Sequence, residues 1–137
     1  HCDADGRYSV YDDSLGNVNY LRGVQAAGDD GVVTFTTVYP GCYEGRWPHM
    51  HFEVYSSLAD ATSGSATPIA TSQVAHSETL SRAVYAQPGY EASVDTFSRV
   101  SLSSDGVFSD GVDQQTPTES GSPTSSLTLR LVVPVNS

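Results

Sequence analysis

The sequence has no lysine, six arginines, two cysteines, one methionine and one tryptophan among 137 residues. Sixteen acidic residues against six basic ones leave a formal net charge of −10. A nucleic-acid partner is not expected, because phosphate binding needs clustered Lys and Arg. A membrane span is not expected either, since no apolar run approaches the ~18 residues that one requires. The 38% of hydrophobic and 16% of charged residues instead fit one packed domain.

The two cysteines, Cys2 and Cys42, leave two alternatives open. A lysine-free, acidic chain rich in Ser and Thr is a common composition among secreted proteins, and an even pair of cysteines there permits one disulfide. Such a bridge would stabilise the fold by about 3–4 kcal/mol in the chain-entropy model. Two buried free thiols are an equally good alternative. A secreted location is therefore expected, whereas the state of the thiols is not decided.

Strand signals dominate the chain. Short runs of β-branched and aromatic residues alternate with Gly, Pro and Asp turn signals, and no repeat or interdomain linker interrupts them. Strands are predicted at residues 8–11, 20–24, 32–38, 49–55, 69–74 and 127–135. Ser77 is the predicted N-cap of a helix over residues 77–85, and residues 61–67 read as a loop. We expect one all-β domain over residues 1–137, a β-sandwich of mostly antiparallel short strands with at most one or two short helices.

The stretch from residue 39 to 55, YPGCYEGRWPHMHFEVY, contains a pair of histidines that could begin a metal site. Residues two apart on a strand point to the same face, so His49 and His51 project side by side. A pair of this kind is often an ordinary surface feature, and it also occurs in cupins and copper-zinc superoxide dismutases. The pair by itself therefore does not identify the metal.

Further ligands have to come from carboxylates or phenols. Two cysteines cannot complete a four-thiolate zinc centre, and Glu44 and Glu53 could add a carboxylate to the two imidazoles. Tyr8, Tyr39 and Tyr43 are the nearby phenols. Because the pKa of a phenol is about 10, only a strongly Lewis-acidic ion such as Fe(III) would hold it ionised at neutral pH.

Several segments of the first 55 residues resemble the intradiol ring-cleavage dioxygenases, the non-haem Fe(III) enzymes that open catechols between their hydroxyls. Residues 1–9, HCDADGRYS, match the family's WHA-x-x-x-G-x-YS segment, and residues 21–23, LRG, match an Arg-containing strand. Residues 40–43, PGCY, match a P-G-x-Y turn, and residues 46–52, RWPHMHF, match R-P-A-H-x-H-F. The sequences of these motifs look most like those of a compact, secreted branch of the family, and the match is loose from about residue 55 to 85.

The resemblance implies a non-haem Fe(III) cofactor, O2 and a small aromatic diol as substrates, and a cis,cis-muconate-type diacid as product. The implied iron ligands are Tyr8, Tyr43, His49 and His51.

The resemblance also implies catalytic roles for Tyr43, Arg46 and Gln73. Tyr43 would act as an internal base, and the Arg46 guanidinium would stabilise negative charge on the ring. The alternative for Arg46 is a surface salt bridge with a nearby glutamate. Tyr39 and Trp47 are the candidate walls of the substrate pocket, although Trp47 could instead pack in the core.

Two further interpretations remain open. The first is a secreted acidic β-sandwich module that binds carbohydrate or calcium, supported by repeated Asp-Gly steps and by the Asp3–Gly6 loop. The second is a cupin-like or dismutase-like metalloprotein that uses His-x-His without phenolates. The family's N-terminal strands and helical dimerisation domain have no counterpart before His1, so the oligomeric state is left open.

Overall fold

The computed structural model describes residues 1–135. Its elements, in chain order, are the 3-10 helix η1 (Asp13–Leu15), strand β1 (His49–Val54), helix α1 (Leu58–Ser63), strand β2 (Ala70–Ala75), helices α2 (Glu78–Tyr85) and α3 (Glu91–Phe97), the 3-10 helix η2 (Leu102–Ser104), and strands β3 (Thr118–Gly121) and β4 (Leu127–Arg130). β1 pairs antiparallel with β2, and β3 pairs antiparallel with β4. None of these helices has the length and apolar character needed to cross a membrane.

The predicted all-β sandwich is wrong. Residues 1–135 form four short strands in two separate two-stranded sheets, together with three α-helices, which makes a small mixed α/β fold. The runs at 20–24 and 32–38 lie in irregular chain and pair with no strand of this part of the molecule. β-branched residues favour an extended backbone, but a ladder also requires a neighbour that supplies N–H and C=O partners.

The predicted strand at residues 8–11 is replaced by a tight turn. The backbone N–H groups of Tyr11 and Asp12 both donate to the carbonyl of Tyr8, at 3.1 and 2.8 Å. Val10 has a φ of 75°, in the left-handed region that a β-branched residue rarely adopts. This turn reverses the chain directly after Tyr8.

The elements next to the histidine pair are predicted correctly. The runs at 49–55 and 69–74 are confirmed as β1 and β2, and the register sets His51 opposite Gln73. The helix at 77–85 is confirmed as α2, and the Ser77 hydroxyl accepts the Leu80 N–H at 3.2 Å.

Two other predicted segments are only partly right. The predicted loop at 61–67 begins inside α1, whose N-cap Ser57 the sequence reading overlooked. The predicted last strand shortens to β4.

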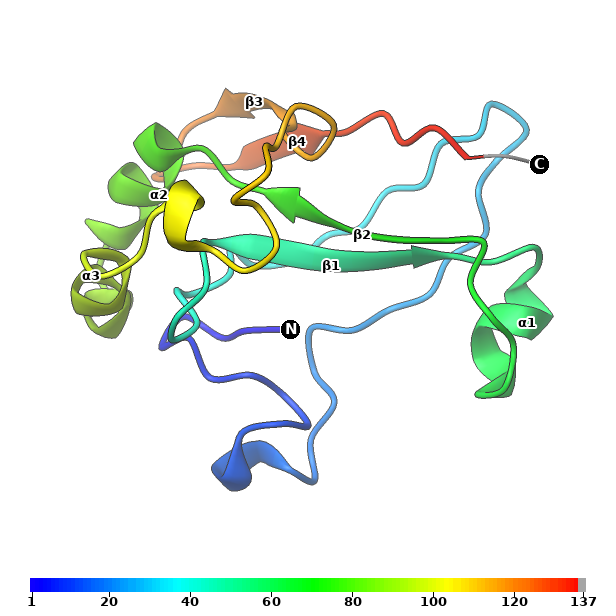
Figure 1. Cartoon of the computed structure of the whole chain (residues 1–137), viewed down its shortest axis with the longest axis horizontal. Coiled ribbons are helices and arrows are strands. Elements are labelled where there is room, and N and C mark those ends of the chain that lie inside the picture. The colour runs from blue at the N-terminus through cyan, green and yellow to red at the C-terminus, as the bar shows by residue number, and fades with distance from the viewer. Residues whose placement is uncertain (136–137) are drawn as a thin grey trace.

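Figure 1 shows β1 and β2 side by side through the middle of the molecule, with α1 at the far end of this pair. α2, α3 and the β3–β4 pair lie at the other end, and the N-terminal segment passes below the start of β1. The buried hydrophobic core gathers at that end and consists of Tyr39, Cys42, Trp47, Ala75, Val84, Tyr85, Phe97 and Phe108. The first residues of β1 therefore lie against the core.

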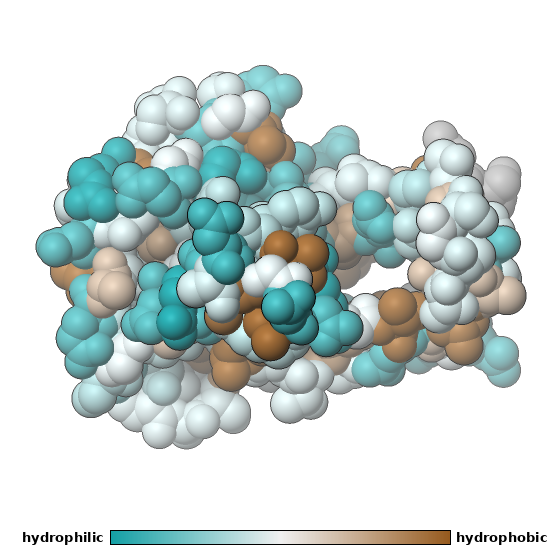
Figure 2. Space-filling model, turned by 90° about the horizontal axis from the view of Figure 1, so that it is seen from below, coloured by the Kyte–Doolittle hydropathy of each residue, from teal (hydrophilic) through white to brown (hydrophobic). Residues whose placement is uncertain are grey.

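Residues 18–38 contribute little to this core. Val24, Val32, Phe35 and Val38 are each 49–51% exposed. Figure 2 shows hydrophobic side chains at the surface on the face seen from below. The packed part of the molecule is thus concentrated around the start of β1, α2 and α3.

His76 is a buried histidine at the junction of β2 and α2. It is 2% exposed, and its ring centroid lies 4.5 Å from that of Tyr39. Neither ring nitrogen has a hydrogen-bond partner among the described residues. Burial lowers the pKa of His76 to about 3, because a charged imidazole loses its hydration there.

The burial of His76 predicts a pH-dependent stability. In the unfolded chain His76 takes up a proton near pH 6.5, but in the folded protein it stays neutral down to about pH 3. The unfolded state therefore binds more protons between these values, and the free energy of unfolding should rise with pH across the window, by up to about 1.4 kcal/mol per pH unit from this residue. Urea unfolding of metal-free protein at pH 4, 5, 6 and 7 would measure the slope. The variant H76Q should reduce this slope, and an unchanged slope in H76Q would contradict the assignment.

Candidate metal centre

Two loops that are distant in the sequence pack backbone against backbone. The Gly41 N–H donates to the Asp3 carbonyl at 2.9 Å, and a Cβ on Gly41 would collide with the backbone of residues 3–6. Ser93 of α3, which is fully buried, accepts the Cys42 N–H at 2.9 Å and donates to the Ala4 carbonyl at 2.8 Å. These contacts join the segments that carry the two predicted tyrosine ligands.

The two tyrosines lie next to each other as a result. The ring centroids of Tyr8 and Tyr43 are 5.3 Å apart, and the Tyr8 ring lies 6.1 Å from that of His51. Arg22 places its guanidinium carbon 5.6 Å from the Tyr8 ring centroid and donates to the Ser9 carbonyl at 2.9 Å. The structure thus places the two predicted phenol ligands next to each other and brings the Tyr8 ring near that of His51.

β1 begins with the histidine pair, and both rings turn toward one point. The Nε2 atoms of His49 and His51 are 3.0 Å apart. Nδ1 of His49 lies 2.6 Å from the Trp47 carbonyl, and this bond requires the hydrogen on Nδ1 because a carbonyl only accepts. Nε2 of His49 therefore presents its lone pair. With metal–nitrogen bonds of about 2.0–2.1 Å, a separation near 3 Å suits two neighbouring ligands on one ion, and the carbonyl fixes the tautomer.

His1 is a third member of this cluster, and the sequence reading did not include it. The ligand atoms of His1, His49 and His51 all lie within 4.8 Å of one another. Nε2 of His1 is buried and has no hydrogen-bond partner in residues 1–135. His1 occurs in the motif that carries Tyr8, but only the fold of the loop places its ring 4.3 Å from the Tyr8 ring. The three imidazoles form a possible metal-binding triad.

The protonation states suit metal binding. Burial lowers the pKa of His49 to about 4, and burial together with the charge of Arg46 lowers the pKa of His51. Both imidazoles are therefore neutral at pH 7, as metal ligands must be. Burial raises the pKa of the Tyr8 phenol, and the Arg22 charge offsets only part of this rise. Tyr8 would need a strong Lewis acid to become a phenolate.

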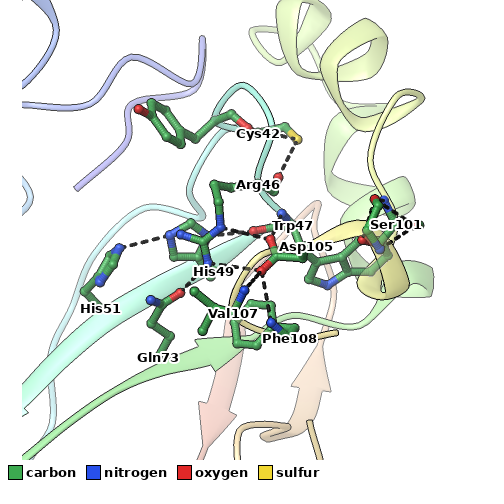
Figure 3. A network of polar contacts seen from close by, with 12 residues as sticks. Cys42, Arg46, Trp47, His49, His51, Gln73, Ser101, Asp105, Val107 and Phe108 are labelled. Carbon is green, nitrogen blue, oxygen red and sulfur yellow. Dashed lines mark hydrogen bonds and ion pairs between the residues drawn. The ribbon is translucent and has the colours of Figure 1, made fainter. Parts of the chain in front are cut away.

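Arg46 and Gln73, which the resemblance implied as active-site residues, are in contact. Nη2 of Arg46 donates to Gln73 Oε1 at 2.7 Å. The alternative salt bridge with a glutamate does not form among the described residues, because Arg46 pairs with Asp105 through Nε at 2.9 Å. Figure 3 shows the Arg46 guanidinium beside His49, with Asp105 on one side and Gln73 on the other. Asp105 is a residue that the sequence reading used only as part of an Asp-Gly turn.

Tyr39 and Trp47, the predicted pocket walls, lie in the core instead. Tyr39 is 8% exposed, and its hydroxyl lies 2.8 Å from Ser81 Oγ. Trp47 is 4% exposed; its Nε1 donates to the His76 carbonyl at 2.7 Å, and its ring centroid lies 5.1 Å from that of Phe97. Trp47 affects the cluster through its backbone, since its carbonyl orients His49.

The cysteines and the Asp3–Gly6 loop do not supply ligands to the triad. Cys2 and Cys42 are buried free thiols, so the second of the two alternatives applies. Burial raises their pKa values to about 11 and about 12, which keeps both protonated at neutral pH. Asp3 and Asp5 form ion pairs with Arg7 at 2.8 and 3.3 Å, an arrangement that competes with calcium binding in this loop.

No protein-family model, no curated protein and no solved structure matches the chain. The likeness to intradiol dioxygenases therefore stays a prediction from motifs. Any functional conclusion has to be argued from the geometry of the site.

The imidazole triad predicts stoichiometric metal binding that depends on His49 and His51. After incubation with Fe or Zn salts and dialysis, elemental analysis should find about one ion per chain. H49A and H51A should each bind the metal at least about 10–100-fold more weakly. That is the loss of metal affinity seen when only a residue hydrogen-bonded to a ligand is removed. H76Q changes a histidine outside the triad and should retain the metal. Equal retention by H49A, H51A and H76Q would show that the triad does not hold the ion.

Proposed function

We propose that this chain is a non-haem Fe(III)-dependent dioxygenase that cleaves catechol-type aromatic diols with O2, between the two hydroxyls, to cis,cis-muconate-type diacids. The observation that carries the proposal is that the Tyr8 ring lies next to a second phenol and to a strand-borne imidazole, each from a separate segment. The Tyr8 ring lies 5.3 Å from Tyr43 and 6.1 Å from His51, and the two histidine rings are 4.8 Å apart.

The residues fit a ferric ion. Phenol oxygens are hard ligands that favour a strongly Lewis-acidic ion, and two neutral imidazoles complete a mixed oxygen and nitrogen set. The unpartnered, buried Nε2 of His1 is the kind of atom that a neighbouring ion or its ligand would satisfy. Tyr8, Tyr43, His49 and His51 would hold the ion, which supplies Lewis acidity toward a chelating diol.

Two side chains of this site would handle the proton and the charge of the substrate. Tyr43, which is half-buried on the loop before β1, takes a proton from one diol hydroxyl at its phenolate oxygen and thereby acts as a base. Arg46 cannot lose its charge, so its guanidinium stabilises negative charge on the ring. Gln73 holds the Nη2 end of that guanidinium at 2.7 Å.

The triad favours a second candidate, a metalloprotein that binds its ion through His1, His49 and His51 without phenolates. This is the cupin-like or dismutase-like alternative, and the closeness of the three imidazoles within 4.8 Å supports it. A phenolate bound to Fe(III) absorbs visible light by charge transfer, whereas a three-imidazole zinc site is colourless. Colour therefore separates the two candidates. For either candidate, the lysine-free acidic composition supports a secreted protein.

The proposed function predicts a burgundy iron protein that consumes O2 when catechol is added. Y43F should weaken the charge-transfer band, because one phenolate is lost, and should lower kcat by about 10²-fold or more, within the range for removing a general base. Visible absorption spectroscopy measures the band, and oxygen uptake together with product analysis by chromatography measures kcat.

Y11F is the matched control, since Tyr11 is 71% exposed although its ring lies 5.0 Å from Tyr8. It should keep the colour and the rate. An iron-loaded wild-type protein that is colourless and inert toward catechols would overturn the dioxygenase proposal.

A further inference from the structure

The Asp105 carboxylate is a charged group buried next to the metal centre. Its side chain is 0% exposed, a position that is strongly unfavourable for a charge without partners. Its partners are the Arg46 Nε at 2.9 Å and Nη2 at 3.3 Å, and the backbone N–H groups of Trp47 at 2.7 Å, Val107 at 2.8 Å and Phe108 at 3.1 Å.

Three of these donors belong to the backbone, so the position of the carboxylate does not depend on Arg46. Val107 and Phe108 lie two and three residues after Asp105 in a turn, and Trp47 precedes β1 by two residues. Desolvation would raise the pKa of Asp105, but the hydrogen bonds from Arg46 and these N–H groups outweigh it and hold the pKa below its usual range. Asp105 is thus a fixed, ionised anchor, and the flexible Arg46 side chain is the group that it restrains.

Arg46 is held on two of its three nitrogens. Nε and Nη2 are engaged by Asp105 and Gln73, whereas Nη1 donates to no residue between 1 and 135. The side chain keeps 20% exposure. Glu44, the nearest competing carboxylate along the chain, pairs with Arg99 at 3.1 Å. The two N–H donors of Nη1 are therefore left for a ligand beside His49 (Figure 3).

We propose that Asp105 is a positioning residue, which fixes the Arg46 guanidinium so that its Nη1 faces the negative charge of a bound catecholate. This inference rests on the proposed function and adds a residue to it, 59 positions along the chain from the side chain that it holds. A guanidinium fixed before the substrate arrives needs no reorganisation when charge develops, which is the condition under which such a donor is most effective.

A double-mutant cycle tests this role. D105N keeps the shape of the side chain but removes the charge that the guanidinium needs, and R46Q removes the guanidinium. Each single variant should lower kcat/KM for catechol by about 10²-fold, the scale of a misplaced catalytic group. The double variant should be no slower than R46Q, because Asp105 acts through Arg46 and the two losses are not additive. E78Q, which breaks the exposed Arg82–Glu78 pair of 2.7 Å, is the matched control and should leave kcat/KM unchanged.

A purely structural role for Asp105 gives different results. If D105N slows the R46Q protein by the same factor as it slows the wild type, or if kcat/KM per folded molecule of D105N equals that of the wild type, the proposal is overturned. Wild-type protein without turnover would instead reject the proposed function, so the two failures are distinguishable.

A second measurement covers the case in which D105N does not fold. In wild-type protein loaded with diamagnetic Ga(III), the Arg46 Nε–H, assigned by its absence from R46Q, should exchange with solvent at least about tenfold more slowly than the Nε–H of Arg82, which is bonded to an exposed carboxylate. Equal exchange rates would show that Asp105 does not hold the guanidinium and would overturn the proposal by themselves.

Discussion

The candidate metal centre depends on the backbone contact between residues 3–6 and residues 41–42. Tyr8 lies in a turn that belongs to neither sheet, so no ladder of hydrogen bonds holds it near β1. The close approach at Gly41 and the two hydrogen bonds of the buried Ser93 hydroxyl replace that ladder. Ser93 comes from α3, and the helical end of the molecule thereby determines where the two phenols meet.

The ligand-type side chains are held with different rigidity. His49 and His51 stand on a paired strand, and the Trp47 carbonyl fixes one ring, so the imidazoles are preorganised. Tyr8 and Tyr43 lie on loops, where a side chain can move more easily. This division suits the proposed function, in which the imidazoles would stay in place while a phenol would take up a proton. The burial of these residues agrees with this division, since β1 begins against the core whereas Tyr43 is half-buried.

Buried polar groups concentrate around this site and are satisfied to different degrees. Asp105 and Ser93 are buried and hydrogen-bonded, and each connects segments more than 50 residues apart. Both ring nitrogens of His76 and Nε2 of His1 are buried without a hydrogen-bond partner in the part of the chain that the structure describes. Leaving a buried nitrogen without a hydrogen-bond partner costs free energy of folding. A bound ion or its ligand would remove this cost for His1, whereas the cost at His76 remains.

The local sequence determined β1, β2, the N-cap of α2 and the side-by-side projection of His49 and His51, because period-2 alternation and capping depend on residues only a few positions apart. It could not determine whether residues 8–11, 20–24 and 32–38 become strands, since a strand needs a neighbour that these runs lack. The tertiary structure alone decided that Tyr39 and Trp47 pack in the core, that His1 joins the imidazoles, and that Asp105 reaches Arg46. Each of these contacts links segments far apart in the chain. The packing of the whole molecule decides which segments meet, and no local sequence pattern encodes that packing.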